Sequence, residues 1–120
     1  MRAVVDTNVL IDFLQGHRAA ADELARYDAV EVSAISAAEL LVGAPTEAAE
    51  RAVDTLLAAC VVVAVDEPIA REAAFLRRSA RVRLPDAIVW ATARVRSALL
   101  VTREEGLPAG APEVRHPYRV

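Results

Sequence analysis

Four short apolar segments divide the chain and constrain its fold more than any other feature. They lie at residues 3–5, 30–32, 61–65 and 98–101, and each is nearly continuous in aliphatic residues. Strands that are covered on both faces have this pattern. Segments of helical period lie between them, at residues 9–13, 19–27, 36–42, 46–59, 68–80 and 85–96. The alternation predicts an α/β fold with a parallel sheet wrapped by helices, and a short edge strand is expected at 113–115.

Length and composition set the domain count and the compartment. A chain of 120 residues suits one domain, spanning residues 1–120. Its single cysteine, Cys60, excludes an internal disulfide and fits a reducing cytoplasm. No apolar run approaches the roughly 18 residues that span a bilayer, and no signal peptide is recognisable. We therefore expect a cytoplasmic protein that makes no contact with a membrane.

The charged residues exclude several classes of enzyme. All 14 basic residues are arginine, so a P-loop lysine and a Schiff-base lysine are both excluded. The chain also has no glycine-rich phosphate loop, which argues against binding of a nucleoside triphosphate. The net charge of −3 argues against a surface that is positive throughout, although a local basic patch can still bind nucleic acid.

Four acidic residues are expected at one edge of the sheet. In parallel α/β folds, functional groups gather outside the carboxyl ends of the strands. The acidic residues that follow a strand or open a helix at that edge are Asp6, Glu39, Asp86 and Glu104. Carboxylates that lie close together repel one another unless a cation lies between them. Three or four carboxylates with little histidine form a hard oxygen site, which suits Mg²⁺ or Mn²⁺ better than zinc.

Local roles compete with the metal hypothesis at each position. Asp6 is a favoured helix N-cap residue. Asp86, beside Pro85, falls in a first helical turn, where a carboxylate complements the helix dipole or pairs with an arginine. Asp12 falls in the middle of a helix and is expected to face solvent.

Two further acids match a capping box, in which a Glu three residues after a Ser or Thr caps a helix. Ser36-x-x-Glu39 is one match, so the sequence leaves Glu39 equally consistent with capping and with a place in the site. Thr102-x-x-Glu105 is the other, which leaves Glu104 as the neighbouring acid without a local role.

Arginine is concentrated just before Asp86. Residues 71–83 contain one acid and five arginines, Arg71, Arg77, Arg78, Arg81 and Arg83, which gives a local charge of +4. The pattern fits a solvated helix face and equally a rail for a phosphate backbone.

Hard-cation carboxylate sites commonly act on phosphates. A phosphodiester and a small phosphate monoester are both candidate substrates. The residue two positions after Asp6 is Asn8, which weakens the comparison with haloacid-type phosphatases. A module that binds RNA or protein without cutting it is the third hypothesis, with the acids serving as caps and ion-pair partners.

Four motifs together resemble a known family. They are V-V-D-T-N-V-L-I-D at the start, S-A-A-E-L in the second βα unit, L-P-D-A-I-V-W-A-T-A before the last long strand and L-L-V-T-R at its end. In order and in spacing they resemble the PIN domain, and more narrowly the VapC-type toxin ribonucleases of bacterial type II toxin–antitoxin pairs. The resemblance spans nearly the whole chain.

The resemblance implies a three-layer α/β/α sandwich on a mainly parallel five-stranded sheet. It also implies an endoribonuclease that depends on Mg²⁺ or Mn²⁺ and uses metal-activated water, leaving a 5′-phosphate and a 3′-hydroxyl. The implied partners are RNA, a second copy of the chain in a homodimer, and a VapB-type antitoxin whose C-terminal segment occupies the active-site groove.

The resemblance also assigns residues. Metal-binding and catalytic roles fall on Asp6, Glu39, Asp86 and Glu104, and supporting roles on Thr7, Asn8 and Thr102. Beside such a metal site, we interpret the arginine-rich segment as the surface that binds RNA, through Arg77, Arg78, Arg81 and Arg83. The family usually has aspartate or asparagine at the fourth acidic position, two residues after the threonine. Glu104 is one methylene longer and is followed by Glu105, so the sequence leaves open which of the two serves.

Overall fold

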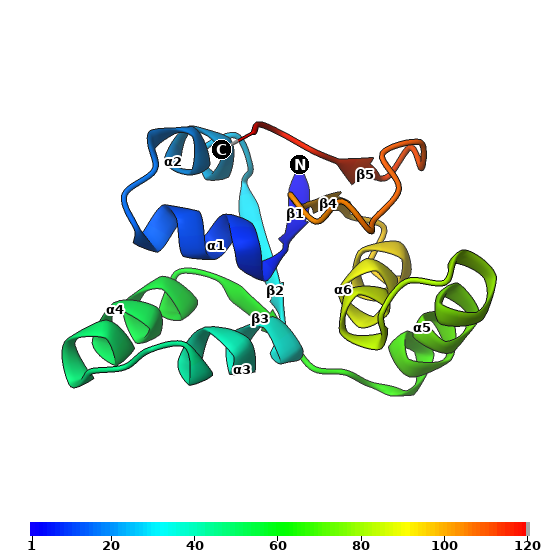
Figure 1. The fold of residues 1–120 in the computed structure, drawn as a ribbon, viewed down its shortest axis with the longest axis horizontal. Coiled ribbons are helices and arrows are strands. Elements are labelled where there is room, and N and C mark those ends of the chain that lie inside the picture. Colours follow the sequence, from blue (N-terminus) through cyan, green and yellow to red (C-terminus); the bar gives the residue numbers. More distant parts are fainter. Residues whose placement is uncertain (120) are drawn as a thin grey trace.

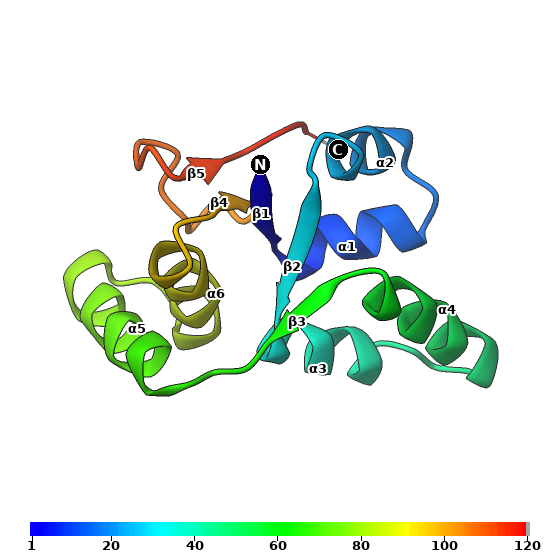
Figure 2. The same cartoon turned by 180° about the vertical axis from the view of Figure 1, so that it is seen from behind.

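The computed structural model describes residues 1–119 as a five-stranded sheet with helices on both faces (Figures 1 and 2). The strands are β1 (Arg2–Val5), β2 (Ala29–Ser33), β3 (Val61–Val63), β4 (Leu99–Val101) and β5 (Val114–Arg115). The helices are α1 (Thr7–Leu14), α2 (Arg18–Leu24), α3 (Ala34–Val42), α4 (Glu47–Ala58), α5 (Glu67–Ala80) and α6 (Leu84–Val95). Neighbouring strands are all parallel, in the order β3-β2-β1-β4-β5. The predicted α/β sandwich on a parallel sheet is confirmed.

Two hydrophobic cores separate the layers. One core contains Leu76 of α5 and Trp90 of α6, and the other contains Leu10 of α1 and Val53 of α4. Successive strand residues alternate between the cores, since Val4 belongs to the first core and its neighbours in β1 to the second. Figure 1 shows the same division, with α5 and α6 on one side of the sheet and α1 to α4 on the other. None of these helices is long and apolar enough to cross a membrane.

The strand order creates a topological switch point beside β1, and the region outside the carboxyl ends of β1 and β4 is here called the crevice. From β1 the chain moves outward through β2 and β3, then crosses over to β4 on the opposite side of β1. The helix that follows β1 (α1) and the helix that leads into β4 (α6) lie on opposite faces, and ligands of parallel α/β folds bind at such a switch point. The backbone N–H of Asp6 donates to the carbonyl of Val101 at 2.9 Å, so the ends of β1 and β4 lie side by side.

The start of α3 differs from the capping-box prediction. Ser33, the last residue of β2, is the N-cap, and its Oγ accepts a hydrogen bond from the backbone N–H of Ile35 at 3.3 Å. The strand passes directly into the helix, so Ser36 is a buried residue inside α3 rather than its cap. The Ser36–Glu39 capping box is therefore wrong, and Glu39 is free of that role.

Two further local predictions are wrong, the capping box at Thr102 and the solvent exposure of Asp12. Thr102 does not start a helix, since the described residues after it contain no helix. Its Oγ1 accepts from the backbone N–H of Glu104 at 2.9 Å in a turn. Glu105 is consequently an exposed loop residue and not part of a capping box. Asp12 does not face solvent either: it is only 3% exposed, because residues from the distant C-terminal part of the chain cover it.

Candidate active site

Asp6 lies at the bottom of the crevice, 5% exposed. It is the N-cap of α1, and its Oδ1 accepts a hydrogen bond from the backbone N–H of Thr7 at 2.8 Å. Its Oδ2 accepts from the hydroxyl of Thr102 at 2.7 Å. Both carboxylate oxygens are thus held in place, so the N-cap and site interpretations of Asp6 are compatible.

The environment of Asp6 disfavours its charge. Burial raises the pKa of Asp6 to about 6, against the opposing effect of the hydrogen bonds from Thr102 and Thr7. The negative charges of Asp86 and Glu39 raise this pKa further. A buried acid that is surrounded by like charges is typical of functional sites, because a bound cation would remove the penalty.

Glu39 reaches the crevice from α3. Its Oε1 accepts a hydrogen bond from the Thr7 hydroxyl at 2.8 Å, which ties it to the residue next to Asp6. Thr7 therefore holds both neighbouring acids, Asp6 through its backbone N–H and Glu39 through its side chain.

Asp86 occupies the first turn of α6 and is 8% exposed. Its Oδ2 accepts a hydrogen bond from Nε of Arg83, the N-cap residue of the same helix, at 3.1 Å. The hydrogen bond to Asp86 raises the pKa of Arg83, and the negative charges of Asp86, Glu104 and Glu39 raise it further. The exposed Arg83 guanidinium is therefore a positive charge beside Asp86, and one of the four predicted RNA-binding arginines lies at the site itself.

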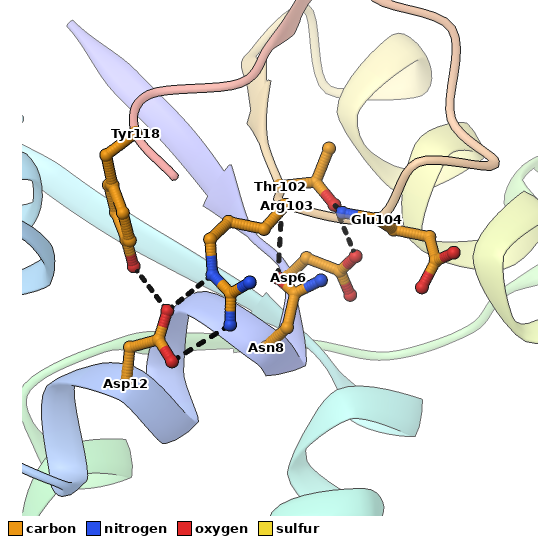
Figure 3. A network of polar contacts seen from close by, with 7 residues as sticks. All are labelled: Asp6, Asn8, Asp12, Thr102, Arg103, Glu104 and Tyr118. Atoms are coloured by element: carbon orange, nitrogen blue, oxygen red, sulfur yellow. Dashed lines mark hydrogen bonds and ion pairs between the residues drawn. The ribbon is translucent and has the colours of Figure 1, made fainter. Parts of the chain in front are cut away.

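Glu104 lies in the turn after β4, and Figure 3 shows it beside Thr102. Its backbone N–H donates to Thr102 Oγ1 at 2.9 Å, and its Oε1 accepts from the backbone N–H of Gly106 at 3.4 Å. The side chain of Glu105 is exposed, while Glu104 attracts Arg83 electrostatically. These contacts favour Glu104 over Glu105 as the fourth acid.

Asn8 supports the same turn from α1. Its Oδ1 accepts a hydrogen bond from the backbone N–H of Arg103 at 3.2 Å, so it fixes the main chain between Thr102 and Glu104 (Figure 3). We expected Asn8 to steady the Asp6 carboxylate or its water, and the partner in this structure is instead the Arg103 main chain.

The sequence analysis missed a second group of residues at this turn. Arg103, Asp12 and Tyr118 form one hydrogen-bonded network, drawn in Figure 3. One local signal was available, because Asp12 is three residues after Val9 and therefore shares its buried helix face. No local sequence pattern could predict the partners of Asp12, because Arg103 and Tyr118 lie 91 and 106 residues away in sequence.

The donor set has the chemistry of a hard-cation site. Asp6, Glu39, Asp86 and Glu104 all offer carboxylate oxygen, which Mg²⁺ and Mn²⁺ prefer as a ligand. Within residues 1–119, no three Asp, Glu, His or Cys side chains converge closely enough to hold one ion as they stand. One oxygen of Asp86, Oδ2, is bound by the Arg83 guanidinium, which would compete with an ion for that oxygen. The four carboxylates fit a hard cation in donor type and in charge. In this structure the Arg83 guanidinium provides a positive charge beside one of them, Asp86.

The other predicted RNA-binding arginines lie near this site. Arg77 and Arg78 are exposed in the last turn of α5, and Arg81 follows as its C-cap with a φ of 58°. The loop that they begin leads directly to Arg83 and Asp86 at the start of α6. The basic segment and the acidic crevice are therefore neighbours.

Comparisons with known proteins agree on the family. The PIN domain family model matches residues 3–111. A solved toxin–antitoxin complex from Klebsiella pneumoniae contains a chain that is 34% identical, with a TM-score of 0.92, covering 98% of this chain and 99% of that one. VapBC-5 from Mycobacterium tuberculosis is 26% identical over 95% of both chains, with a TM-score of 0.68.

A more distant structure shares the fold. VapC20 from Mycobacterium tuberculosis, a toxin that cleaves the sarcin–ricin loop, is 20% identical over 95% of this chain and 99% of its own, with a TM-score of 0.70. A comparison with curated proteins found no significant match. From the family match and the 34% identity across nearly the full length, the chain belongs to the PIN domain family and resembles its VapC-type members.

Proposed function

We propose that the protein is a metal-dependent endoribonuclease and the toxin of a toxin–antitoxin pair. The observation that carries this proposal is the buried Asp6, held by two hydrogen bonds at the switch point and surrounded by the charges of Asp86 and Glu39. PIN domains of the VapC type are nucleases, as the RNA-cleaving VapC20 illustrates. The sarcin–ricin loop is named as the target of VapC20 alone.

The side chains of the crevice would have different roles, some binding the metal and others orienting the ligands. Asp6, Glu39 and Asp86 would hold Mg²⁺ or Mn²⁺, with Glu104 supporting them. A divalent ion in that place supplies Lewis acidity to the scissile phosphate and to the attacking water. Thr102 and Thr7 keep the Asp6 and Glu39 carboxylates oriented. Attack by water then leaves a 5′-phosphate and a 3′-hydroxyl.

RNA would approach along the arginine segment. Arg77, Arg78 and Arg81 are exposed next to the crevice and offer charge to the phosphate backbone, which positions a nucleic acid without reading its sequence. Arg83 would join them once an ion had taken over its role beside Asp86.

Partners follow from the same proposal. The relatives come from toxin–antitoxin complexes, which supports a VapB-type antitoxin as the inhibitor and a cytoplasmic place of action. A groove of about 240 Å³ lies between α1, α3 and α4, beside Glu39, and is lined by apolar residues such as Ile11, Leu40 and Val53. This groove suits an apolar antitoxin segment that ends at the acidic crevice. We also propose a homodimer.

The first prediction concerns catalysis. Asp86→Asn should reduce cleavage by more than the roughly 10–100-fold that loss of a supporting residue costs a metal site, because it removes a ligand. The measurement is cleavage of total RNA by the antitoxin-free protein in Mg²⁺, Mn²⁺ or EDTA, with mapping of fragment ends. Asp54→Asn, on the exposed side of α4, is the matched control and should cleave like wild type.

The outcomes separate the three hypotheses. Metal-dependent fragments with 5′-phosphates that disappear in Asp86→Asn are expected. Hydrolysis of p-nitrophenyl phosphate with intact RNA would indicate a phosphatase instead. Binding of RNA without cleavage and without metal binding would indicate the non-catalytic module.

The second prediction concerns pH and stability without metal. The folded-state pKa of Asp6, about 6, lies above its ordinary value of 3.8, so ionised Asp6 destabilises the fold. The penalty is absent below pH 3.8, grows as the pH rises from 3.8 to 6 and is constant above that, at roughly 2–3 kcal/mol.

Asp6→Asn removes the penalty, since its side chain stays neutral. In urea melts without metal, the variant should be more stable than wild type at pH 8, and the gain should shrink towards pH 4.5. Saturating Mg²⁺ should stabilise wild type but not the variant. If the free energies of unfolding of the variant and of wild type differed by the same amount at pH 8 and pH 4.5, burial would not hinder the ionisation of Asp6, and the prediction would be wrong.

The third prediction concerns Arg83. If its guanidinium competes with a cation for Asp86, Arg83→Gln should bind Mn²⁺ roughly twofold to fivefold more tightly, the range expected for a partly exposed ion pair. Isothermal titration measures the affinity. Arg78→Gln removes the same charge from the end of α5 and should leave the affinity unchanged or change it less. Weaker Mn²⁺ binding by Arg83→Gln would contradict competition.

A further inference from the structure

The turn after β4 sends its side chains in opposite directions. Thr102 donates to the Asp6 carboxylate, while the next residue, Arg103, points to Asp12 on α1 (Figure 3). Glu104 then lies on the crevice side again, where its charge attracts Arg83. Whatever holds the Arg103 side chain therefore also sets the direction of the residues before and after it.

Arg103 is held by two oxygens of one buried acid. Its Nε donates to Asp12 Oδ2 at 2.6 Å and its terminal nitrogen donates to Asp12 Oδ1 at 3.0 Å, a bidentate pair. Asp12 is 3% exposed, so this pair is among the least exposed ion pairs of the described residues. Asn8, one helical turn before Asp12, accepts from the Arg103 backbone N–H and fixes the main chain as well.

The C-terminal tail completes the arrangement. The hydroxyl of Tyr118 donates to Asp12 Oδ2 at 2.7 Å, and the guanidinium carbon of Arg103 lies 5.9 Å from the centre of the Tyr118 ring. One tyrosine thus binds the acid by its hydroxyl and faces the cation with its ring. It links the tail to a turn that has no regular secondary structure of its own.

We propose that Asp12, Arg103 and Tyr118 form a brace, here called the tail brace, that positions Thr102 and Glu104 against the metal-binding acids. Tyr118 is then a positioning residue for the reaction, although it touches neither Asp6 nor Glu104 in the network drawn in Figure 3. The proposal rests on the proposed function, because it assumes that the crevice binds a cation.

The chain offers a matched control for the tail brace. Tyr27, Glu23 and Arg115 form a second tyrosine–carboxylate–arginine group, in which Arg115 donates to Glu23 at 2.7 and 3.0 Å. Glu23 is also buried, and the Tyr27 hydroxyl donates to it. This group links α2 to β5, and its side-chain hydrogen bonds do not involve the turn at residues 102–104.

The experiment compares Tyr118→Phe with Tyr27→Phe in the full chain. Each variant loses one hydroxyl that donates to a buried, arginine-paired carboxylate, so both should lose a similar, small amount of stability without metal. Only Tyr118→Phe should weaken Mn²⁺ binding, by roughly threefold to tenfold, somewhat less than a direct supporting residue of a metal site. Amide exchange at Arg103 and Glu104 should also become faster in Tyr118→Phe alone.

A second variant strengthens the comparison. Arg103→Lys keeps the charge but cannot form the bidentate pair, so it should weaken Mn²⁺ binding at least as much as Tyr118→Phe. Equal Mn²⁺ affinity in Tyr118→Phe and Tyr27→Phe, with unchanged exchange at residues 103 and 104, would overturn the tail brace.

The results also separate this inference from the nuclease proposal. Selective loss of Mn²⁺ affinity in a protein that cleaves no RNA would support the brace and contradict the nuclease. RNA cleavage and Mn²⁺ binding that are indifferent to both Tyr118→Phe and Arg103→Lys would contradict the brace alone. A wild-type protein that binds no Mn²⁺ would contradict both.

Discussion

The hydrogen bond from Thr102 to Asp6 joins the ends of the neighbouring strands β1 and β4 at the point where the Asp6 carboxylate is buried. Asp6 follows β1 and Thr102 follows β4, so this contact closes the crevice at the switch point. It offsets only part of the cost of burying a carboxylate, and the pKa of Asp6 stays near 6. The fold thus holds an acid in a position that weakens the metal-free protein, which is common where function and stability conflict.

Arg83 supplies a positive charge to the neighbouring acid, Asp86. It is the N-cap of α6 and extends back over the first turn to Asp86, so the same helix supplies an acid and its counter-ion. The pair is mostly open to solvent on the arginine side. Such a pair is weak, which suits a charge that has to leave when a divalent cation arrives. A lysine-free chain uses arginine for this purpose, and the same side chain can then bind phosphate in a planar, bidentate way.

The parallel sheet and the edge that carries the acids were predictable, and the hydrogen-bond partners of individual side chains were less so. The apolar segments and the turns between them were enough to predict the parallel sheet, and the rule about strand ends was enough to place Asp6, Glu39 and Asp86 at one edge. The capping boxes failed because β2 runs into α3 without a loop and because no helix follows Thr102. The Asp12–Arg103 pair joins residues 91 positions apart, and such a pair leaves no periodic trace in a single sequence.

Metal soaking of crystals would show directly whether the crevice is a cation site and whether Arg83 leaves Asp86 when an ion binds. Crystals of the antitoxin-free protein would be soaked in Mn²⁺, and the ion located from its anomalous scattering. We expect a peak bound by the carboxylates of Asp6 and Asp86, with Arg83 no longer hydrogen-bonded to Asp86. A saturated crystal with no peak in the crevice, and with Arg83 still on Asp86, would contradict this expectation.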